Sequence, residues 1–545
     1  MTDDEVVLAR GSPSFSVKGM TTTRLANANE STFWAHHAWS EFAALPSKEH
    51  VLVVLPVHGF ADHGLGMPLD VEETVTTEAL RRAVGHLPAS TGIRVLPPLR
   101  FALAPYPSTF FGIDPETAHD LVREIALCVK TSGFRKLVLL NSSPWNVEFI
   151  DAASRDARVE LGLQSFVVNV SGLGLDLHPS SPNRVTFQAL ASRLLDRPPA
   201  TSIRAGDVEE PDFRPGTWRQ PAPVAFDPSI DGAERLRQAS LHLARLLLEI
   251  DAKSPLGSPR SPKDTVVQST PKPLSVGSRD EMESGRPWPD YRKHYLMALT
   301  RDELEDLPDK ENAFVILPTG AIEQHGHHLP VGVDAIIGQA WLNAALPKLP
   351  PSVNVWVAPP ITFGKSNEHV GFPGTITLSA KSLRRLVLAS ARQLHLLGFR
   401  NLGVLNTHGG NSAVLVYTIR EIQSTLGMRA GIIGSNYPAP LSPQEREYGF
   451  HAGEWETSLM LASTENLVRM DRAVCEFPAR LDDPGELRPE NAPAIFSWIS
   501  SDVSRSGAMG DATRASVDKG RLWMEEASSA LAKRITHLAT RGFST

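Results

Sequence analysis

Carboxylate and imidazole side chains are concentrated in a short segment near the middle of the chain. Glu323, His325 and Asp334 lie within twelve residues, directly after the apolar run 313–317. Residues i and i+2 that leave a strand point to the same side, so Glu323 and His325 can face one point. Carboxylate and imidazole ligands suit Zn²⁺, Mn²⁺ or Fe²⁺ rather than a metal that prefers thiolates. The segment therefore predicts half of a divalent metal site at the edge of a sheet.

Three further clusters in the second half carry the same chemical types. They are Asn406-Thr-His408-Gly-Gly-Asn after the apolar run 402–405, His451 to Glu456 before a helical pattern, and Glu368-His369 before Gly-Phe-Pro-Gly. In an open parallel sheet, ligand-binding residues gather on loops beyond the carboxyl ends of the strands. We therefore expect His408 to join the first cluster. Glycines 409 and 410 allow the backbone to pass close to a ligand.

The elements that position these residues alternate between strand and helix patterns. Apolar runs at 51–56, 93–97 and 136–140 predict buried strands, and amphipathic patterns at 77–87 and 115–132 predict helices. Asp114-Pro115 supplies an N-cap followed by a proline at the first helical position. Strands that alternate with helices are typical of βαβ units with a mostly parallel sheet.

The pattern of the first half returns in the second half. At an offset of 262 residues, 51–56 falls on 313–318, His63-Gly64 falls on His325-Gly326, and Pro97-Pro98 falls on Pro359-Pro360. At an offset of 265 residues, Gly133-Phe-Arg falls on Gly398-Phe-Arg. So many matches in one order indicate a tandem duplication.

The two copies differ at the residues that carry the chemistry. At the positions of Glu323, Asp334, His408 and His451, the first copy has Ala61, Glu72, Ser143 and Arg204. Only His63 and Glu209 remain as ligand candidates there, whereas a catalytic metal usually needs at least three. We therefore expect the first copy to be a non-catalytic scaffold.

Composition restricts the class of protein. With 545 residues, 41% hydrophobic and 21% charged, the chain resembles a globular protein of more than one domain. A net charge of −7 argues against nucleic acid or an anionic membrane as the main partner. Two cysteines in different halves offer no disulfide framework. No apolar run approaches a membrane span, and the acidic start lacks a signal pattern, so we expect a cytoplasmic protein.

The expected domains follow from the repeat and the composition. A flexible N-terminus covers 1–25, the degenerate copy covers 26–250, and the catalytic copy covers 291–545. Residues 251–290 between them are rich in Ser and Pro and lack an apolar period, which is typical of a linker.

Four motifs of the second half together resemble the creatininase family. They are Glu323-Gln-His-Gly-x-His-Leu-Pro with Asp334, Glu368-His-x-x-Phe-Pro-Gly-Thr, Asn406-x-His-Gly-Gly-Asn and His451-x-Gly-x-x-Glu-Thr-Ser. The resemblance covers about 292–545, and about 30–250 as a degenerate copy. It implies two tandem αβα three-layer sandwiches with mostly parallel central sheets, and a two-metal hydrolase site in the second. Family members form hexamers, so three tandem chains would build a pseudo-hexamer.

The resemblance also implies roles for individual residues. Glu323 and His408 would bind one metal, His325 the other, and Asp334 would bridge them. His451 and Glu456 would sit beside the metals as proton-transfer or substrate-binding groups, with Glu456 also a candidate ligand. Glu368 and His369 are expected to line the substrate pocket, and Trp455 either walls that pocket or fills core. Creatinine amidohydrolases of the family carry Tyr-Glu where this chain has Gly409-Gly410.

The expected activity is hydrolysis of an amide C–N bond outside peptides, in a small cyclic amide or a formamide. Metal ions would lower the pKa of water toward 7 and so provide a hydroxide nucleophile. A proton from His451 or Glu456 would go to the departing nitrogen, because an amide anion is a poor leaving group. The alternatives are a peptidase of the same family and a non-catalytic binding or assembly protein.

Overall fold

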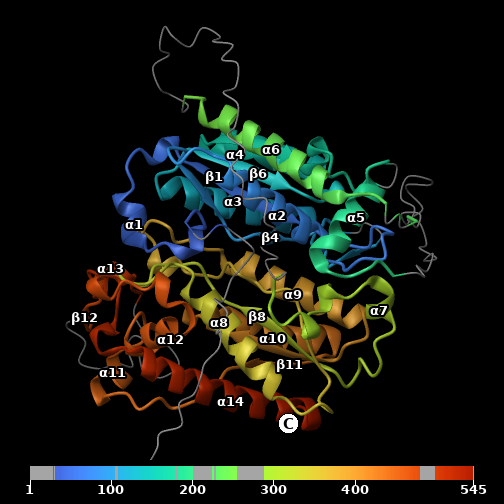
Figure 1. Cartoon of the computed structure of the whole chain (residues 1–545). Coiled ribbons are helices and arrows are strands. Elements are labelled where there is room, and N and C mark those ends of the chain that lie inside the picture. The colour runs from blue at the N-terminus through green and yellow to red at the C-terminus, as the bar shows by residue number, and fades with distance from the viewer. Residues whose placement is uncertain are drawn as a thin grey trace, which may run out of the picture.

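Two α/β units stacked on each other form the molecule (Figure 1). The computed structural model describes residues 29, 31–104, 108–178, 181–200, 224–225, 227, 229–254, 288–478 and 497–543. Arg204, Glu209 and most of the predicted linker lie outside these residues. Among the described residues, no helix is long and apolar enough to cross a membrane.

The first unit has a parallel sheet with helices on both faces. The strand order is β3-β1-β6-β7, and β4 also pairs with β1. Its strands are β1 (Leu52–His58), β3 (Ile93–Val95), β4 (Leu99–Arg100), β6 (Lys136–Asn141) and β7 (Gln164–Asn169). Its helices are α1 (Trp39–Ala44), α2 (Val71–Gly85), α3 (Pro115–Thr131), α4 (Val147–Leu161), α5 (Arg184–Leu195) and α6 (Gly232–Asp251). Helices α2, α5 and α6 form one layer, and α3 and α4 form the other.

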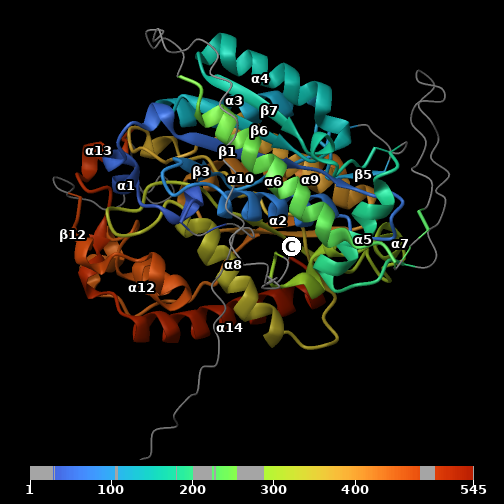
Figure 2. The same cartoon turned by 45° about the horizontal axis from the view of Figure 1, so that its top comes forward.

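The second unit repeats this architecture. Its sheet has the order β9-β8-β10-β11, with β8 (Phe314–Thr319), β9 (Val355–Val357), β10 (Asn401–Asn406) and β11 (Arg429–Ile433). Helices α8 (Val333–Ala345), α12 (Glu454–Thr464) and α14 (Val517–Arg541) form one layer, and α9 (Ala380–Leu396) and α10 (Ser412–Leu426) form the other (Figure 2). The shorter helices are α7 (Arg301–Glu305), α11 (Pro443–Tyr448) and α13 (Ser500–Val503). Two-stranded antiparallel pairs join β2 (Phe60–Ala61) to β5 (Thr109–Phe110), and β12 (Cys475–Glu476) to β13 (Gly510–Asp511).

Strand register confirms the tandem duplication. Leu52 pairs with Ile93 and Lys136, and Phe314 pairs with Val355 and Asn401, at the offsets of the sequence repeat. Every residue of β1 and β8 is buried, as predicted for strands covered on both faces. The prediction for α2 was wrong at its start, because the helix begins at Val71 rather than residue 77. Its first turns bury Glu72 and Glu73, so they show no amphipathic pattern.

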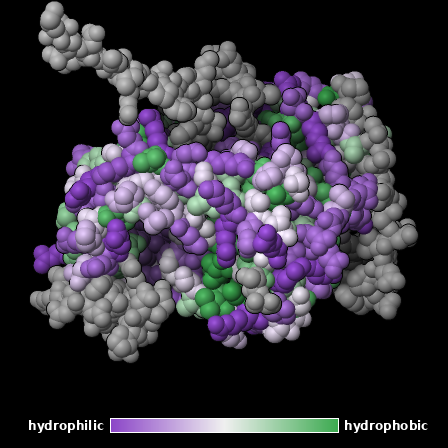
Figure 3. Space-filling view, turned by 90° about the horizontal axis from the view of Figure 1, so that it is seen from below, coloured by the Kyte–Doolittle hydropathy of each residue, from purple (hydrophilic) through white to green (hydrophobic). Residues whose placement is uncertain are grey.

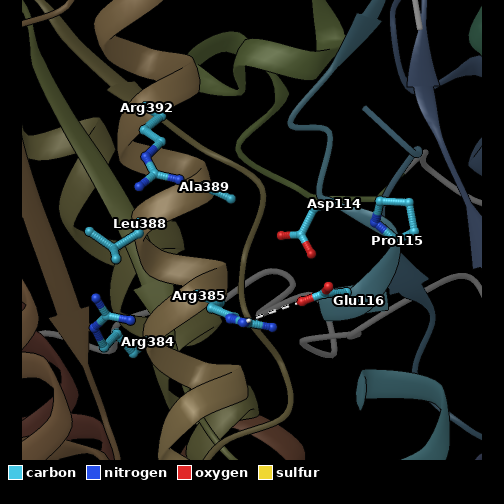
Figure 4. A pocket seen from close by; sticks show the side chains of 8 residues that line it. All are labelled: Asp114, Pro115, Glu116, Arg384, Arg385, Leu388, Ala389 and Arg392. Carbon is cyan, nitrogen blue, oxygen red and sulfur yellow. Dashed lines mark ion pairs between the residues drawn. The ribbon is translucent and has the colours of Figure 1, made fainter. Parts of the chain in front are cut away.

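The two units contact each other through helices α3 and α9. A groove of about 640 Å³ lies at this junction, between the start of α3 and the side of α9 (Figure 4). Arg385 from α9 reaches Glu116 at 3.7 Å across the groove. The face of the molecule seen from below is mostly hydrophilic, with a compact hydrophobic patch at its lower centre and smaller hydrophobic areas elsewhere (Figure 3).

Candidate metal centre

The ligand candidates lie at the carboxyl ends of two neighbouring strands. Loop 320–332 leaves β8 and carries Glu323 and His325, and Asp334 lies in the first turn of α8. His408 follows β10, which pairs in parallel with β8. All four side chains are buried. This is the edge at which open parallel sheets bind their ligands.

Four groups of three candidate ligands occur among the described residues, and two of these groups share Asp334. The first contains Glu323, Asp334 and His408, and the second contains His325, Asp334 and Glu456, with the atoms of each group within 4.8 Å of one another. Asp334 Oδ2 lies 3.7 Å from His408 Nδ1, and Asp334 Oδ1 lies 3.6 Å from His325 Nε2. Asp334 therefore lies between the two groups, where it could serve both of them.

Buried polar atoms without hydrogen bonds converge at this point. Glu323 Oε2, His325 Nε2 and Asp334 Oδ2 are buried and make no hydrogen bond of good geometry, although His408 Nε2 lies 3.2 Å from Glu323 Oε2 and His325 Nε2 lies 3.6 Å from Asp334 Oδ1. An unsatisfied buried polar atom costs about 1–3 kcal/mol, so three in one cluster need a physical reason. Coordination of a divalent cation supplies that reason, and these residues fit such an ion.

One nitrogen of each imidazole lies at a backbone carbonyl, and this contact selects the tautomer. His325 Nδ1 lies 3.0 Å from the carbonyl of Glu323, and His408 Nε2 lies 2.9 Å from the carbonyl of Lys365. A carbonyl oxygen only accepts, so these nitrogens carry the hydrogen. His325 Nε2 and His408 Nδ1 then present their lone pairs toward Asp334, as metal ligands require.

Electrostatics in the cluster favour a bound cation. Burial would lower the pKa of His325, but Asp334 and the other nearby carboxylates raise it to about 9. Burial would likewise lower the pKa of His408, but the surrounding carboxylates raise it to about 10. Burial raises the pKa of Glu456 to about 7, and burial with Glu323 raises that of Asp334. The cluster thus holds protons tightly where positive charge is needed, and a divalent ion can replace them.

His451 and Glu456 come to the cluster from the start of α12. His451 Nδ1 is 3.7 Å from Glu323 Oε1, and its Nε2 donates to the carbonyl of Gln324 at 2.7 Å. The backbone amide of Ala452 donates to Glu456 Oε2 at 2.6 Å, and Ala452 has φ of +54°. A non-glycine residue in this conformation is strained. The strained turn between His451 and Glu456 brings both side chains to the cluster.

Gln324 is a site residue that the sequence reasoning missed. Its amide nitrogen donates to His369 Nδ1 at 2.8 Å and to the carbonyl of Gly507 at 2.9 Å. His369 Nε2 then lies 3.3 Å from Glu323 Oε1. Burial alone would raise the pKa of Glu323, but His369 and His408 lower it well below its usual range. Successive residues that leave a strand point to opposite sides, so Gln324 points away from Glu323 and His325 and orients His369.

The predicted substrate-binding residues lie at different places. Glu368 Oε1 is 3.6 Å from His408 Nε2, beside Gly410, so it faces the ligand candidates. The ring of His369 stacks on that of His451 at 4.4 Å. Trp455 stacks on Trp523 of α14 at 5.4 Å. With Tyr437, Trp455 lines a separate hollow of about 640 Å³.

The corresponding site of the first half is closed by its own side chains. His63 Nε2 and Glu72 Oε1 form a fully buried hydrogen bond at 2.8 Å. Glu72 Oε2 also accepts from the amide of Gly59 at 2.9 Å and from Ser142 Oγ at 3.0 Å. The carboxylate at the bridging position is therefore already satisfied by protein donors, unlike Asp334.

Comparison with known proteins identifies the family to which both halves are similar and several relatives of the chain. The profile of the family Creatininase, described as creatinine amidohydrolase, matches residues 35–202 and 297–535, two segments that begin 262 residues apart. The chain is 31% identical to a mycofactocin precursor peptide peptidase of Mycolicibacterium smegmatis, over 41% of this chain and 83% of the relative. It is 30% identical to a creatinine amidohydrolase of Pseudomonas putida, over 44% of this chain and 95% of the relative.

A solved structure described as creatininase Mn is 26% identical, with a TM-score of 0.37, and covers 44% of this chain and 97% of that chain. Each of these relatives spans less than half of the chain, because the chain contains two copies of the unit. The profile match covers more than half of the sequence and both copies. The chain belongs to the creatininase family of hydrolases.

Proposed function

We propose that the second half is a metal-dependent amidohydrolase that cleaves the C–N bond of a small cyclic amide or a formamide. The main support is the pair of buried ligand groups that share Asp334. Glu323, Asp334 and His408 would hold one ion, and His325, Asp334 and Glu456 the other. Carboxylates and imidazoles without a thiolate suit Zn²⁺, Mn²⁺ or Fe²⁺.

Bound ions of this kind polarise a carbonyl oxygen and lower the pKa of water toward 7. His451 would then carry the proton that amide hydrolysis must deliver to the departing nitrogen. Its Nε2 is held by the carbonyl of Gln324, so Nδ1 is the atom that takes and returns the proton. Burial and the neighbouring His325 and His369 lower the pKa of His451 well below its usual range. Its protonated form is consequently a strong proton donor.

Cleavage of a peptide is the second candidate function. It is favoured by the 31% and 32% identity to two mycofactocin precursor peptide peptidases, similar to the 30% identity to creatinine amidohydrolase. A peptide bond is itself an amide, so the same residues would serve. The two functions differ in the substrate and not in the proposed proton transfer.

A panel of lactams, formamides, cyclic ureas and short peptides tests the proposal. The full chain is loaded with Zn²⁺ or Mn²⁺, and released amine or carboxylate is followed by mass spectrometry. We expect metal-dependent hydrolysis of a lactam, cyclic urea or formamide, and a loss of about 10²–10⁴-fold in His451→Ala. Hydrolysis of peptides alone would select the second candidate. A metal-loaded chain that hydrolyses none of them would contradict both.

A further inference from the structure

The first residues of the first half pair with the metal-ligand loop of the second half. The amide of Val331 donates to the carbonyl of His37 at 2.9 Å, and the amide of Gly332 donates to the carbonyl of Ala35 at 3.0 Å. Val331 also accepts from the amide of Glu323 at 2.8 Å. One side of the loop that carries Glu323 is therefore fixed by backbone from the other half.

The same contacts exist in the opposite direction. The amide of Leu69 donates to the carbonyl of Leu299 at 2.9 Å, and the amide of Asp70 donates to the carbonyl of Met297 at 3.1 Å. Each of these residues is 262 positions from its counterpart in the first pair, which is the offset of the repeat. Each half thus fixes the loop of the other, as the subunits of a two-fold symmetric dimer do.

Side chains of the first half extend these contacts to further loops of the metal centre. The indole of Trp39 lies 4.7 Å from the ring of His327 and 5.0 Å from that of Phe372. Its Nε1 donates to the carbonyl of Ser506 at 3.2 Å. His327 is on the ligand loop, Phe372 follows the Glu368-His369 segment, and Ser506 precedes the carbonyl that holds Gln324. One half-buried side chain therefore touches three separate loops of the metal centre.

Two glycines show how closely the halves approach here. A Cβ at Gly332 would lie 2.6 Å from the carbonyl oxygen of Ala35, and a Cβ at Gly374 would lie 2.4 Å from the ring of Phe42. Trp34 Nε1 also donates to the carbonyl of Gly374 at 2.7 Å. Such contacts leave no room for a shift of one half against the other without moving the loops.

The aromatic contact is present at only one of the two equivalent positions. The residue 262 positions after Trp39 is Arg301, which pairs with Glu305 at 2.6 Å and reaches Asp62 at 3.9 Å. The degenerate site thus faces a guanidinium where the metal centre faces an indole in tilted and edge-on ring contacts. The indole thus faces the half that has the proposed metal ligands, and the guanidinium faces the half that has lost them.

We propose that the degenerate half acts as a built-in partner subunit that completes the metal centre of the other half. Trp39 is the positioning residue that holds its three loops in register. This rests on the proposed function in that the centre binds metal, but the contacts themselves exist without it. The degenerate copy is retained because its backbone at Ala35 and His37 holds the ligand loop in place.

The test uses the full chain with Trp39→Ala and Trp39→Phe, and with Arg301→Ala as the symmetry-matched control. Hydrogen exchange of residues 323–334 is measured without metal, and the Zn²⁺ dissociation constant is measured by chelator competition. In Trp39→Ala we expect exchange of this loop to rise at least about tenfold and Zn²⁺ affinity to fall about tenfold, as for other residues that orient ligands. Trp39→Phe retains the ring contacts and should fall between Trp39→Ala and the parent.

Arg301→Ala should match the parent in both measurements. The proposal is overturned if Trp39→Ala also matches the parent, or if Trp39→Ala and Arg301→Ala change both measurements equally. If Trp39→Ala does not fold, Trp39→Phe decides by the same comparison. A parent that binds no Zn²⁺ would contradict the proposed function, while hydrogen exchange of the metal-free loop would still test the role of Trp39.

Discussion

Gly410 is a position at which one added methyl group would disturb several parts of the metal centre together. A Cβ there would lie 2.1 Å from Glu368 Oε1, 2.4 Å from the carbonyl oxygen of Lys365 and 2.5 Å from His408 Nε2. Ordinary contacts begin at 3.4 Å, so each of these atoms must move by about 1 Å. Because the Lys365 carbonyl also holds His408, the ligand moves with it.

The size of the effect follows from these displacements. Forcing an extra methyl group into a packed site costs about 1–3 kcal/mol of stability. A misplacement of about 1 Å in catalytic geometry costs on the order of 10²-fold in rate. We therefore expect Gly410→Ala to lower kcat/KM by about 100-fold and to weaken Zn²⁺ binding by at least about tenfold.

The neighbouring glycine provides a matched control. A Cβ at Gly409 would meet no atom within 4 Å, so Gly409→Ala adds the same methyl group to open space. Both variants are compared by Zn²⁺ titration, by kcat/KM on the substrate found for the parent, and by thermal unfolding. Gly409→Ala should resemble the parent. Equal behaviour of the two variants would refute the idea that the approach of Glu368 and Lys365 to residue 410 shapes the centre.

Three further predictions follow from the buried charges. Asp334→Asn should abolish the stabilisation by Zn²⁺, which is about 2.7 kcal/mol for the parent at a Zn²⁺ concentration 100 times the dissociation constant. Without metal, Asp334→Asn should unfold at or above the parent's temperature, because burial and Glu323 disfavour the charged carboxylate. Calorimetry with and without Zn²⁺ measures both effects. Zn²⁺ affinity should rise between pH 6 and 9 by up to about 100-fold per pH unit. His325 and His408, with pKa values of about 9 and about 10, must each release a proton before they bind the ion. Titration calorimetry in buffers of different ionisation enthalpy measures the number of protons released. Burial lowers the pKa of His58 to about 3, so below pH 6.5 the unfolded state binds this proton more readily than the folded state. The free energy of unfolding should therefore decrease as pH falls from 6.5 toward 3, by about 2 kcal/mol at pH 5. Urea unfolding should show a smaller decrease in His58→Gln.

The local features of the fold and the centre could be predicted from sequence because they are short and repeated. The strands β1 and β8 are continuous apolar runs, and the common offset shows that they play the same part. Glu323, His325 and Asp334 lie close together because a strand end and a helix start bracket their loop. His408 follows the neighbouring strand, so sheet topology brings it to the same edge.

Features that depend on contacts between distant segments could not be predicted. Nothing in the local pattern indicates that Glu368 reaches His408, since this depends on how loop 364–370 packs on Gly410. The contact of Trp39 with His327 joins residues nearly 300 positions apart and depends on how the halves pack. The role of Gln324 could not be predicted either, because its partners His369 and Gly507 come from other loops.

Elemental analysis of the freshly purified full chain shows whether the second half binds metal through Asp334. The parent, Asp334→Asn and the control Glu72→Gln, whose carboxylate occupies the equivalent position in the degenerate half, are purified without chelator and measured by mass spectrometry. We predict one divalent ion for each of the two groups that share Asp334, the same content in Glu72→Gln, and loss of bound metal in Asp334→Asn. A parent that takes up no divalent metal even after incubation with Zn²⁺, or an Asp334→Asn variant that keeps the full content, would show that these residues do not form the metal centre.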